Sequence, residues 1–165
     1  MKPGKPADSS KRLKLTDVED TRFLHCNIKT LNLLVNVMAA EKAESMGCGE
    51  CVFHRGDVVT ECAHSNVSII KDGIFKTHPT DHYILPGITR MHIIQICKDN
   101  GIPVDETPFT MAELMDADEI IVSSSTKFCS PACEMNGTPI GGKAPELVKL
   151  IQEKYMEKFE NETAN

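Results

Sequence analysis

The sequence contains no tryptophan, and aromatic residues make up only 5% of its 165 residues. It also lacks an apolar run of the roughly 18 residues that a membrane-spanning helix requires, so we expect no membrane partner. Lys and Arg number 18 against 24 for Asp and Glu, which gives a formal net charge of -6. Because contacts to nucleic-acid phosphates need clustered Lys and Arg, this balance argues against a nucleic-acid partner.

A secretory signal is also missing from the N-terminus. The first fifteen residues, MKPGKPADSSKRLKL, include basic side chains but no apolar core and no small-residue cleavage site. We expect residues 1–14 to form a flexible lead, because Pro, Gly, Lys and Ser dominate them. Seven cysteines in a chain without an export signal indicate free thiols in a reducing cytoplasm.

Four of the cysteines leave a metal site open as an alternative. Cys48-x-x-Cys51 and Cys129-x-x-x-Cys133 could together form a tetrahedral zinc site. However, the second spacing is loose and all four lie among strand-like apolar residues, where buried, inert cysteines are the commoner case. We therefore predict no metal, and metal analysis of the purified protein would decide between the two readings.

Helical and strand patterns alternate along one domain-sized chain. Apolar residues at Leu31, Leu34, Val35 and Met38 predict a helix that ends at Gly47. Further helices are predicted over 85–101, 111–117 and 145–159, and strands or hairpins over 51–61, 66–78, 119–128 and 134–140. Hairpins clustered among helices indicate an α+β fold.

Several polar features together suggest a pyridoxal phosphate site, although each has an ordinary explanation alone. Lys29 stands at a predicted junction between an extended segment and a helix, and Glu61 ends an apolar strand. The helix that starts near Ile88 offers free backbone N–H groups to an anion, and hydroxyls follow at residues 123–126. An amine, a carboxylate and a phosphate cradle are what this cofactor needs.

Five segments, in order from about Leu15 to Phe159, resemble the class IV pyridoxal-phosphate-dependent aminotransferases, and most closely the D-amino acid aminotransferases. They are CNIKTLNLLVNVMAAEKAE, VVTECAHSNVSIIKDGIFKTHP, ILPGITR, PFTMAELMDADEIIVSSST and IGGKAPELVKLIQEKY. The resemblance implies that residues 15–165 form the C-terminal, cofactor-binding domain of such an enzyme, a strand-rich pseudo-barrel with outer helices. It also implies that the family's N-terminal domain is absent from this chain.

The resemblance assigns roles by position. Lys29 matches the catalytic lysine that bonds to the cofactor, and Glu61 matches the carboxylate that contacts its pyridine nitrogen. The other cofactor-binding residues that it implies are Leu85 beside the ring, Ile88, Thr89 and Ser125 at the phosphate, and Arg22 near the site. One departure follows Glu61, where the D-amino acid enzymes tend to have glycine and serines; their hydrogen bonds are here missing or replaced by His64.

The implied reaction is transamination between a D-amino acid of the D-alanine type and a 2-oxo acid, by a partial chain. A homodimer, or pairing with an N-terminal domain, is the implied assembly. Branched-chain aminotransferases and aminodeoxychorismate lyase-like enzymes of the same class are the alternatives within the family. A non-catalytic fragment or binding protein is the alternative from another class, and the sequence leaves it open.

Overall fold

The computed structural model describes residues 11–163. Its helices are α1 (Leu34–Ser45), α2 (Ile88–Asp99), α3 (Met111–Asp116) and α4 (Pro145–Thr163). Its strands are β1 (Leu13–Glu19), β2 (Glu50–Arg55), β3 (Val58–Cys62), β4 (Asn66–Lys71), β5 (Ile74–Thr77), β6 (Val104–Asp105), β7 (Glu119–Ser124), β8 (Phe128–Met135) and β9 (Thr138–Pro139). The α+β class predicted from the sequence is confirmed.

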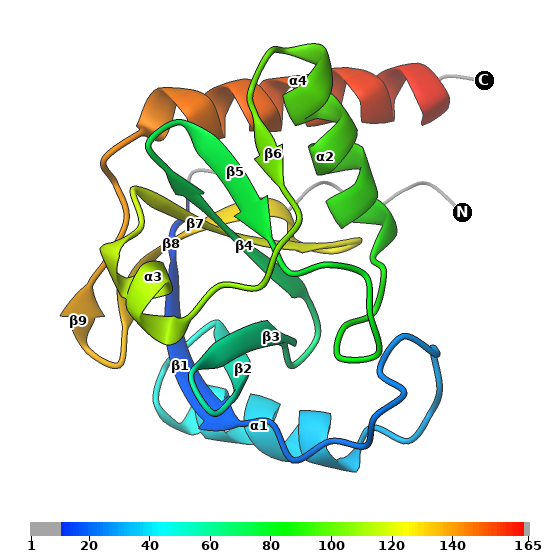
Figure 1. Ribbon diagram of the computed structural model, residues 1–165, viewed down its shortest axis with the longest axis vertical. Helices are drawn as coiled ribbons and strands as arrows, with labels where there is room; N and C mark the ends of the chain where they lie inside the picture. The colour runs from blue at the N-terminus through cyan, green and yellow to red at the C-terminus, as the bar shows by residue number, and fades with distance from the viewer. Residues whose placement is uncertain (1–10, 164–165) are drawn as a thin grey trace.

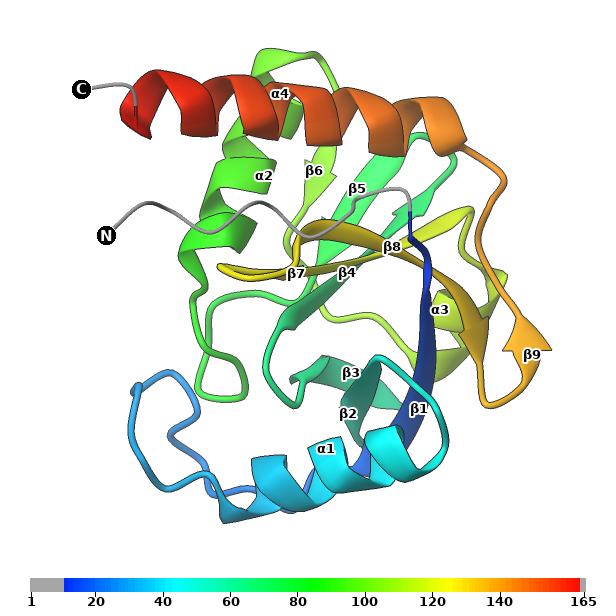
Figure 2. The same ribbon diagram turned by 180° about the vertical axis from the view of Figure 1, so that it is seen from behind.

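All strands belong to one curled sheet that forms a half-barrel (Figure 1). The strand order is β3-β2-β1-β8-β7-β4-β5-β6, and β9 pairs with β8. Helix α1 covers β1–β3 at one end, whereas α2 and α4 pack together over β7 and β8 at the other end (Figure 2). Among residues 11–163, no helix combines the length and apolarity needed to cross a bilayer.

The predicted hairpins are confirmed, and their turn residues explain them. Asp72 and Gly73 between β4 and β5 have φ values of 50° and 78°, and Asn136 and Gly137 between β8 and β9 have 48° and 80°. Positive φ at both central residues is the geometry of a type I′ turn, whose twist matches that of the flanking strands. These two dipeptides therefore fix the register of their hairpins.

Strand β1 was not predicted. It begins at Leu13, inside the expected flexible lead, whereas residues 1–10 of that lead lie outside the described residues. It runs parallel to both β2 and β8, in the middle of the sheet. Neighbours on both sides bury Leu15 and also the polar Thr16, whose hydroxyl bonds to Asn136 Oδ1 at 2.8 Å. Because consecutive residues of β1 are buried whether apolar or polar, its sequence lacks the apolar–polar alternation by which a half-buried strand is recognised.

Apolar side chains on both faces of the sheet form the core. In β7, Ile120 and Val122 belong to the cluster inside the half-barrel, whereas Ile121 belongs to the cluster beneath α2 and α4. A third cluster lies beneath α1 and includes Phe53 and Ala63. Burial on both faces makes β7 a rigid base for the serines at its C-terminal end.

Helix α1 turns its small residues inward and its large ones outward. Ala39 and Ala43 are buried against the sheet, whereas Leu34 and Met38 are 69% and 64% exposed. The helix begins at Leu34 and not at Leu31 as predicted, and Leu31 is 97% exposed in the preceding loop. Of the apolar stripe predicted from the sequence, Val35 packs against the cluster beneath α1, whereas Leu31, Leu34 and Met38 have no covering surface within residues 11–163.

We expect Ile120→Ala and Ile121→Ala each to lower the free energy of unfolding by about 2–5 kcal/mol, because both side chains are fully buried, on opposite faces of β7. Ile74→Ala is the control, because Ile74 on β5 is 41% exposed and should lose less than about 1 kcal/mol. Urea unfolding monitored by circular dichroism measures all three. A small loss at Ile120 or Ile121 would contradict two-sided burial.

Candidate active site

A cavity of about 630 Å³ brings together every site residue predicted from the sequence. Arg22, Lys29, Glu61, Leu85, Ile88, Thr89 and Ser125 all line it. They come from loop 20–33, the end of β3, the segment before α2, the start of α2 and the turn after β7. Loops 20–33 and 78–87 lie side by side in Figures 1 and 2, and Cys26 N–H donates to the His82 carbonyl at 2.9 Å.

Glu61 is buried at the end of β3, and both of its oxygens accept hydrogen bonds. Arg22 Nη1 donates to Oε1 at 2.6 Å. The Leu85 N–H donates to Oε2 at 3.0 Å, and Asn66 Nδ2 donates to the same oxygen at 3.1 Å. These donors come from three different segments and fix the orientation of the carboxylate at the wall of the cavity.

Arg22 is itself held by a second buried carboxylate, Asp20. Arg22 Nε and Nη2 each donate to Asp20 at 2.9 Å, and Arg22 Nη2 also donates to the Tyr83 carbonyl at 3.1 Å. The guanidinium lies 4.3 Å from the centroid of the Phe53 ring, a cation–π arrangement. Arg22 thus lies at the cavity wall and contacts Glu61, while its role in an active site stays a prediction.

Burial and charge shift the pKa values of the two carboxylates, Glu61 and Asp20, in opposite directions. Burial raises the pKa of Glu61 to about 7, although Arg22 and the Leu85 N–H both favour the ionised form. Burial acts on Asp20 as well, but its several bonds from Arg22 outweigh it and hold the pKa of Asp20 below its usual value. Because Asp20 takes most of the guanidinium's hydrogen bonds, Glu61 is incompletely compensated in this cavity.

The start of α2 lies at one corner of the cavity. Gly87 precedes the helix and makes no side-chain cap, so the first backbone N–H groups of α2 stay available. A Cβ on Gly87 would lie 2.2 Å from Asn66 Oδ1, so a larger residue would displace the Asn66 side chain that holds Glu61. Thr89 is buried beside Tyr155, whose hydroxyl lies 3.5 Å from Thr89 Oγ1, and Ser125 is exposed at the facing turn.

Lys29 lies in loop 20–33 and is exposed at the cavity, five residues before α1 begins. The predicted strand-to-helix junction is therefore a loop, because β1 ends at Glu19 and α1 starts at Leu34. The residues around Lys29 include Ile28, which is 55% exposed. Lys29 thus reaches the cavity from its open side, whereas Glu61 forms its buried wall.

Sequence reasoning missed two residues that shape the site. Asp20 is the first residue after β1, and because β1 was not predicted, nothing marked it as buried. Asn66 begins β4, and its Nδ2 joins Glu61 to the Leu85 carbonyl. The available signal was an Asp-x-Arg spacing near the motif lysine, which is too common on protein surfaces to be specific.

The cysteines are free thiols in the structure. Burial raises the pKa of Cys51 and of Cys97 to about 12, and raises that of Cys129 further, so these thiols are poor nucleophiles. Within residues 11–163, no group of three or more His, Cys, Asp or Glu side chains could hold a metal ion. The four cysteines weighed as zinc ligands therefore do not form such a group in the described chain.

The chain was compared with known protein families and with curated proteins. The family described as Amino-transferase class IV matches residues 1–135. The chain belongs to the class IV aminotransferases. It is 48% identical to a D-alanine aminotransferase of Listeria monocytogenes over 136 residues, 81% of this chain and 47% of the relative. It is 46% identical to a D-alanine aminotransferase of Staphylococcus haemolyticus, over 91% of this chain and 55% of the relative.

Solved structures agree on the fold. The branched-chain amino acid aminotransferase of Escherichia coli superimposes with a TM-score of 0.77 at 25% identity, over 88% of this chain and 51% of that one. A hypothetical aminotransferase from Mycobacterium tuberculosis, in a PLP-bound form, gives a TM-score of 0.80 at 20% identity, over 91% and 57%. The chain spans about half the length of the relatives it matches.

The cavity of this class IV aminotransferase chain fits pyridoxal phosphate. Ser65 Oγ lines it and is one of two buried side-chain polar atoms without a hydrogen-bond partner in the described residues. A buried orphan hydroxyl is costly unless a ligand or water satisfies it. The uncapped start of α2 suits a phosphate, and the Glu61 carboxylate suits a cationic ring nitrogen.

The raised pKa of Glu61 predicts a pH-dependent stability. Its ordinary value is 4.5 and its value in the folded protein is about 7, so the folded state binds this proton more tightly than the unfolded state. The free energy of unfolding should therefore fall as pH rises from about 4.5 through 7, by up to about 3 kcal/mol from this group. Urea unfolding of the cofactor-free protein at several pH values measures the fall.

Glu61→Gln should remove that part of the pH dependence, because the amide does not titrate. The control is Glu41→Gln on the exposed face of α1, which should leave the slope unchanged. A Glu61→Gln protein whose stability falls with pH as steeply as the original would contradict the assignment.

Proposed function

We propose that the chain forms the cofactor-carrying half of a pyridoxal-phosphate-dependent transaminase acting between a D-amino acid of the D-alanine type and a 2-oxo acid. The observation that supports this most is the single cavity lined by Lys29, Glu61 and the start of α2. An amine, a buried carboxylate and an anion corner in one pocket are the parts that this chemistry needs. The relatives at 45–48% identity, all D-alanine aminotransferases, support the substrate class.

Each residue has a distinct proposed task. When bound, the cofactor supplies a conjugated ring that accepts the electrons left on the substrate's α-carbon. Lys29 holds the cofactor covalently, and as a free amine it moves the proton to and from that α-carbon. Glu61, fixed by Arg22 and the Leu85 N–H, keeps a proton on the ring nitrogen.

The other lining residues position the cofactor. The backbone N–H groups at Ile88 and Thr89 and the hydroxyl of Ser125 bind the phosphate, while Leu85 packs near the ring. Ser65 Oγ offers a further donor, in place of the hydrogen bonds expected from His64. The His64 side chain is exposed at the cavity, and its backbone N–H donates to Glu50.

An exposed apolar face beside the cavity supports a larger assembly. Leu31, Leu34 and Met38 are 97%, 69% and 64% exposed, and Phe23 and Ile28 extend the face along loop 20–33. An apolar surface of this kind marks a protein–protein contact. We propose that a second half of the enzyme, or a second subunit, covers it and completes the substrate site.

The first test concerns Lys29. Incubation with pyridoxal phosphate, borohydride reduction and peptide mapping should place the cofactor mass on Lys29, because this amine faces the cavity that holds Glu61. Lys29→Arg should lose the label, whereas Lys42→Arg, on α1, should keep it. Labelling spread evenly over several lysines, or retained in Lys29→Arg, would reject the assignment and favour a non-catalytic role.

The second test concerns the chain by itself. We expect no turnover of D-alanine with 2-oxoglutarate, because the cavity is open beside the uncovered apolar face and substrate positioning can supply roughly 7–11 kcal/mol of barrier lowering. Adding a fragment that carries the other half of a D-alanine aminotransferase relative should restore activity. Robust turnover by the 165-residue chain alone would show that it builds a complete substrate site.

The same face predicts self-association. Leu34→Glu should shift sedimentation toward smaller species, since it places a charge on the exposed apolar face of α1. Glu41→Gln, a polar change on the same helix, should leave the sedimentation profile unchanged. Identical profiles for the original chain and Leu34→Glu would count against this face as a contact surface.

A further inference from the structure

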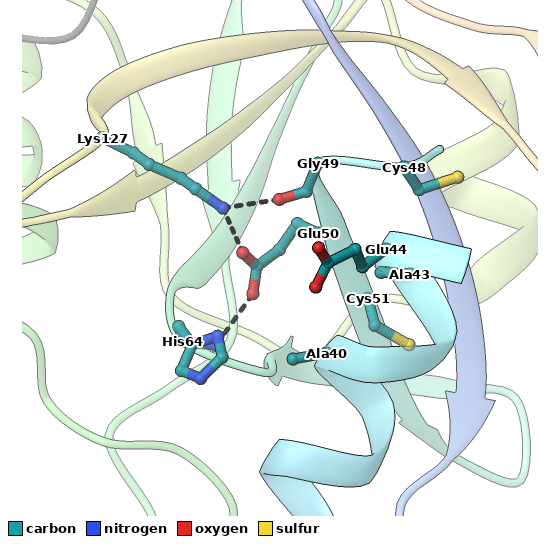
Figure 3. Close-up of a pocket in the computed structure, with 9 residues that line it drawn as sticks. All are labelled: Ala40, Ala43, Glu44, Cys48, Gly49, Glu50, Cys51, His64 and Lys127. Carbon is teal, nitrogen blue, oxygen red and sulfur yellow. Dashed lines mark hydrogen bonds and ion pairs between the residues drawn. The ribbon is translucent and has the colours of Figure 1, made fainter. Parts of the chain in front are cut away.

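A buried carboxylate outside the cofactor cavity joins two of the turns that line it. Glu50 is the first residue of β2, and its side chain is 2% exposed. Its Oε1 accepts the backbone N–H of His64 at 2.8 Å, and its Oε2 forms an ion pair with Lys127 Nζ (Figure 3). Lys127 Nζ also donates to the Gly49 carbonyl at 2.7 Å.

The first contact fixes the turn between β3 and β4. His64 lies between Glu61 and Asn66, and the same turn carries Ser65. The Ala63 N–H also bonds to the Cys51 carbonyl at 2.9 Å, so this turn is tied to β2 at two adjacent residues. Glu50 therefore sets the position of the chain that presents Glu61 and the orphan Ser65 hydroxyl to the cavity.

The second contact fixes the turn between β7 and β8. Lys127 lies two residues after Ser125. Its backbone N–H donates to Ser124 Oγ at 3.1 Å, and its carbonyl accepts a hydrogen bond from Ser130 Oγ at 2.8 Å. These two hydrogen bonds hold the turn in one conformation, and from it the Lys127 side chain extends to Glu50 at the start of β2. Residues 123–125 of this unit line the cofactor cavity.

Stability alone does not account for this pair. Glu50 is removed from water whereas the Lys127 side chain stays 26% exposed, so the cost of desolvating the carboxylate offsets much of the attraction between them. What an ion pair adds is a defined geometry between two elements. A separate surface pocket of about 270 Å³ lies beside the pair and is lined by Glu50, His64 and Lys127, so side-chain packing does not fill the space between the two turns there.

We propose that Glu50 and Lys127 are positioning residues that hold the turn carrying Ser125 at a fixed distance from the turn carrying Ser65, and so shape the phosphate end of the cofactor cavity. This inference rests on the proposed function, because it assumes that the cavity binds pyridoxal phosphate. It predicts that breaking the pair weakens recognition of the phosphate and spares recognition of the ring.

The test compares pyridoxal phosphate with pyridoxal, which lacks the phosphate. Lys127→Met should weaken pyridoxal phosphate binding by about tenfold and change pyridoxal binding by less than about twofold. Glu50→Gln, whose amide oxygen can still accept the His64 N–H, should give the same pattern. The double variant should be no weaker than either single variant, because both remove one interaction.

Two controls separate positioning from folding. Lys127→Arg keeps a cation of similar reach and should retain the phosphate preference of the original chain. Lys71→Met breaks an exposed ion pair at 2.8 Å between the end of β4 and Asp116 of α3, and should leave both affinities unchanged. Circular dichroism and urea unfolding verify that each variant is folded, and Lys127→Gln replaces Lys127→Met if the latter does not fold.

The outcomes distinguish the two proposals. If the original chain binds pyridoxal phosphate at Lys29 but the variants lose both ligands equally, or lose neither, the positioning role is overturned and the proposed function stands. If the original chain does not bind pyridoxal phosphate, the proposed function fails, and this inference fails with it. A selective loss of phosphate recognition, rescued by Lys127→Arg, supports the positioning role.

Discussion

The Arg22 guanidinium, buried between Asp20 and Glu61, is the interaction on which the cavity depends. It contacts the segment after β1, the end of β3 and the Tyr83 carbonyl, and so joins three parts of the chain that are far apart in sequence. A buried cation is tolerated only when its donors are satisfied, and removing one partner leaves a costly uncompensated charge. The three segments are therefore held in one arrangement, and that arrangement places the Glu61 carboxylate at the wall of the cavity.

The same network leaves Glu61 ready for a cationic ligand. Asp20 accepts hydrogen bonds from Arg22, from Arg55 Nε at 3.3 Å and from Thr60 Oγ1 at 3.1 Å, so it is the better compensated of the two carboxylates. Glu61 accepts one hydrogen bond from Arg22, and its other donors are the neutral amides of Asn66 and of the Leu85 backbone. Burial raises the pKa of Glu61 to about 7, and the charge and hydrogen bonds of Arg22 offset that effect only in part. A protonated ring nitrogen would supply further positive charge, which would favour the ionised form of Glu61 and lower its pKa.

Much of this could be predicted from the sequence, for identifiable reasons. Local signals, such as Asp72-Gly73 and Asn136-Gly137, act within a few residues and located the hairpins correctly. The segments that resemble the family predicted which residues line the cavity, because each segment occupies a fixed place in one fold. The sequence did not predict strand β1 or the burial of Asp20, because this burial comes from β2 and β8, which are remote in sequence. The exposure of the apolar side chains on α1 was not predicted for a similar reason. Periodicity identifies an apolar face, but it does not show what covers that face.

That exposed face bears on the chemistry, because it is continuous with the part of the cavity that carries Lys29. Loop 20–33 supplies Arg22 to the buried wall and Lys29 to the open side, and its apolar residues continue onto α1. The buried wall is held by charge, by Phe53 and by the sheet, so it is preorganised within this chain. The open side has fewer such contacts, one of which is the bond from the Cys26 N–H to the His82 carbonyl, and exposed loops with few buried contacts open at low free-energy cost. A partner that covered α1 would also rest against loop 20–33, so the contact that covers the apolar face would also restrain Lys29.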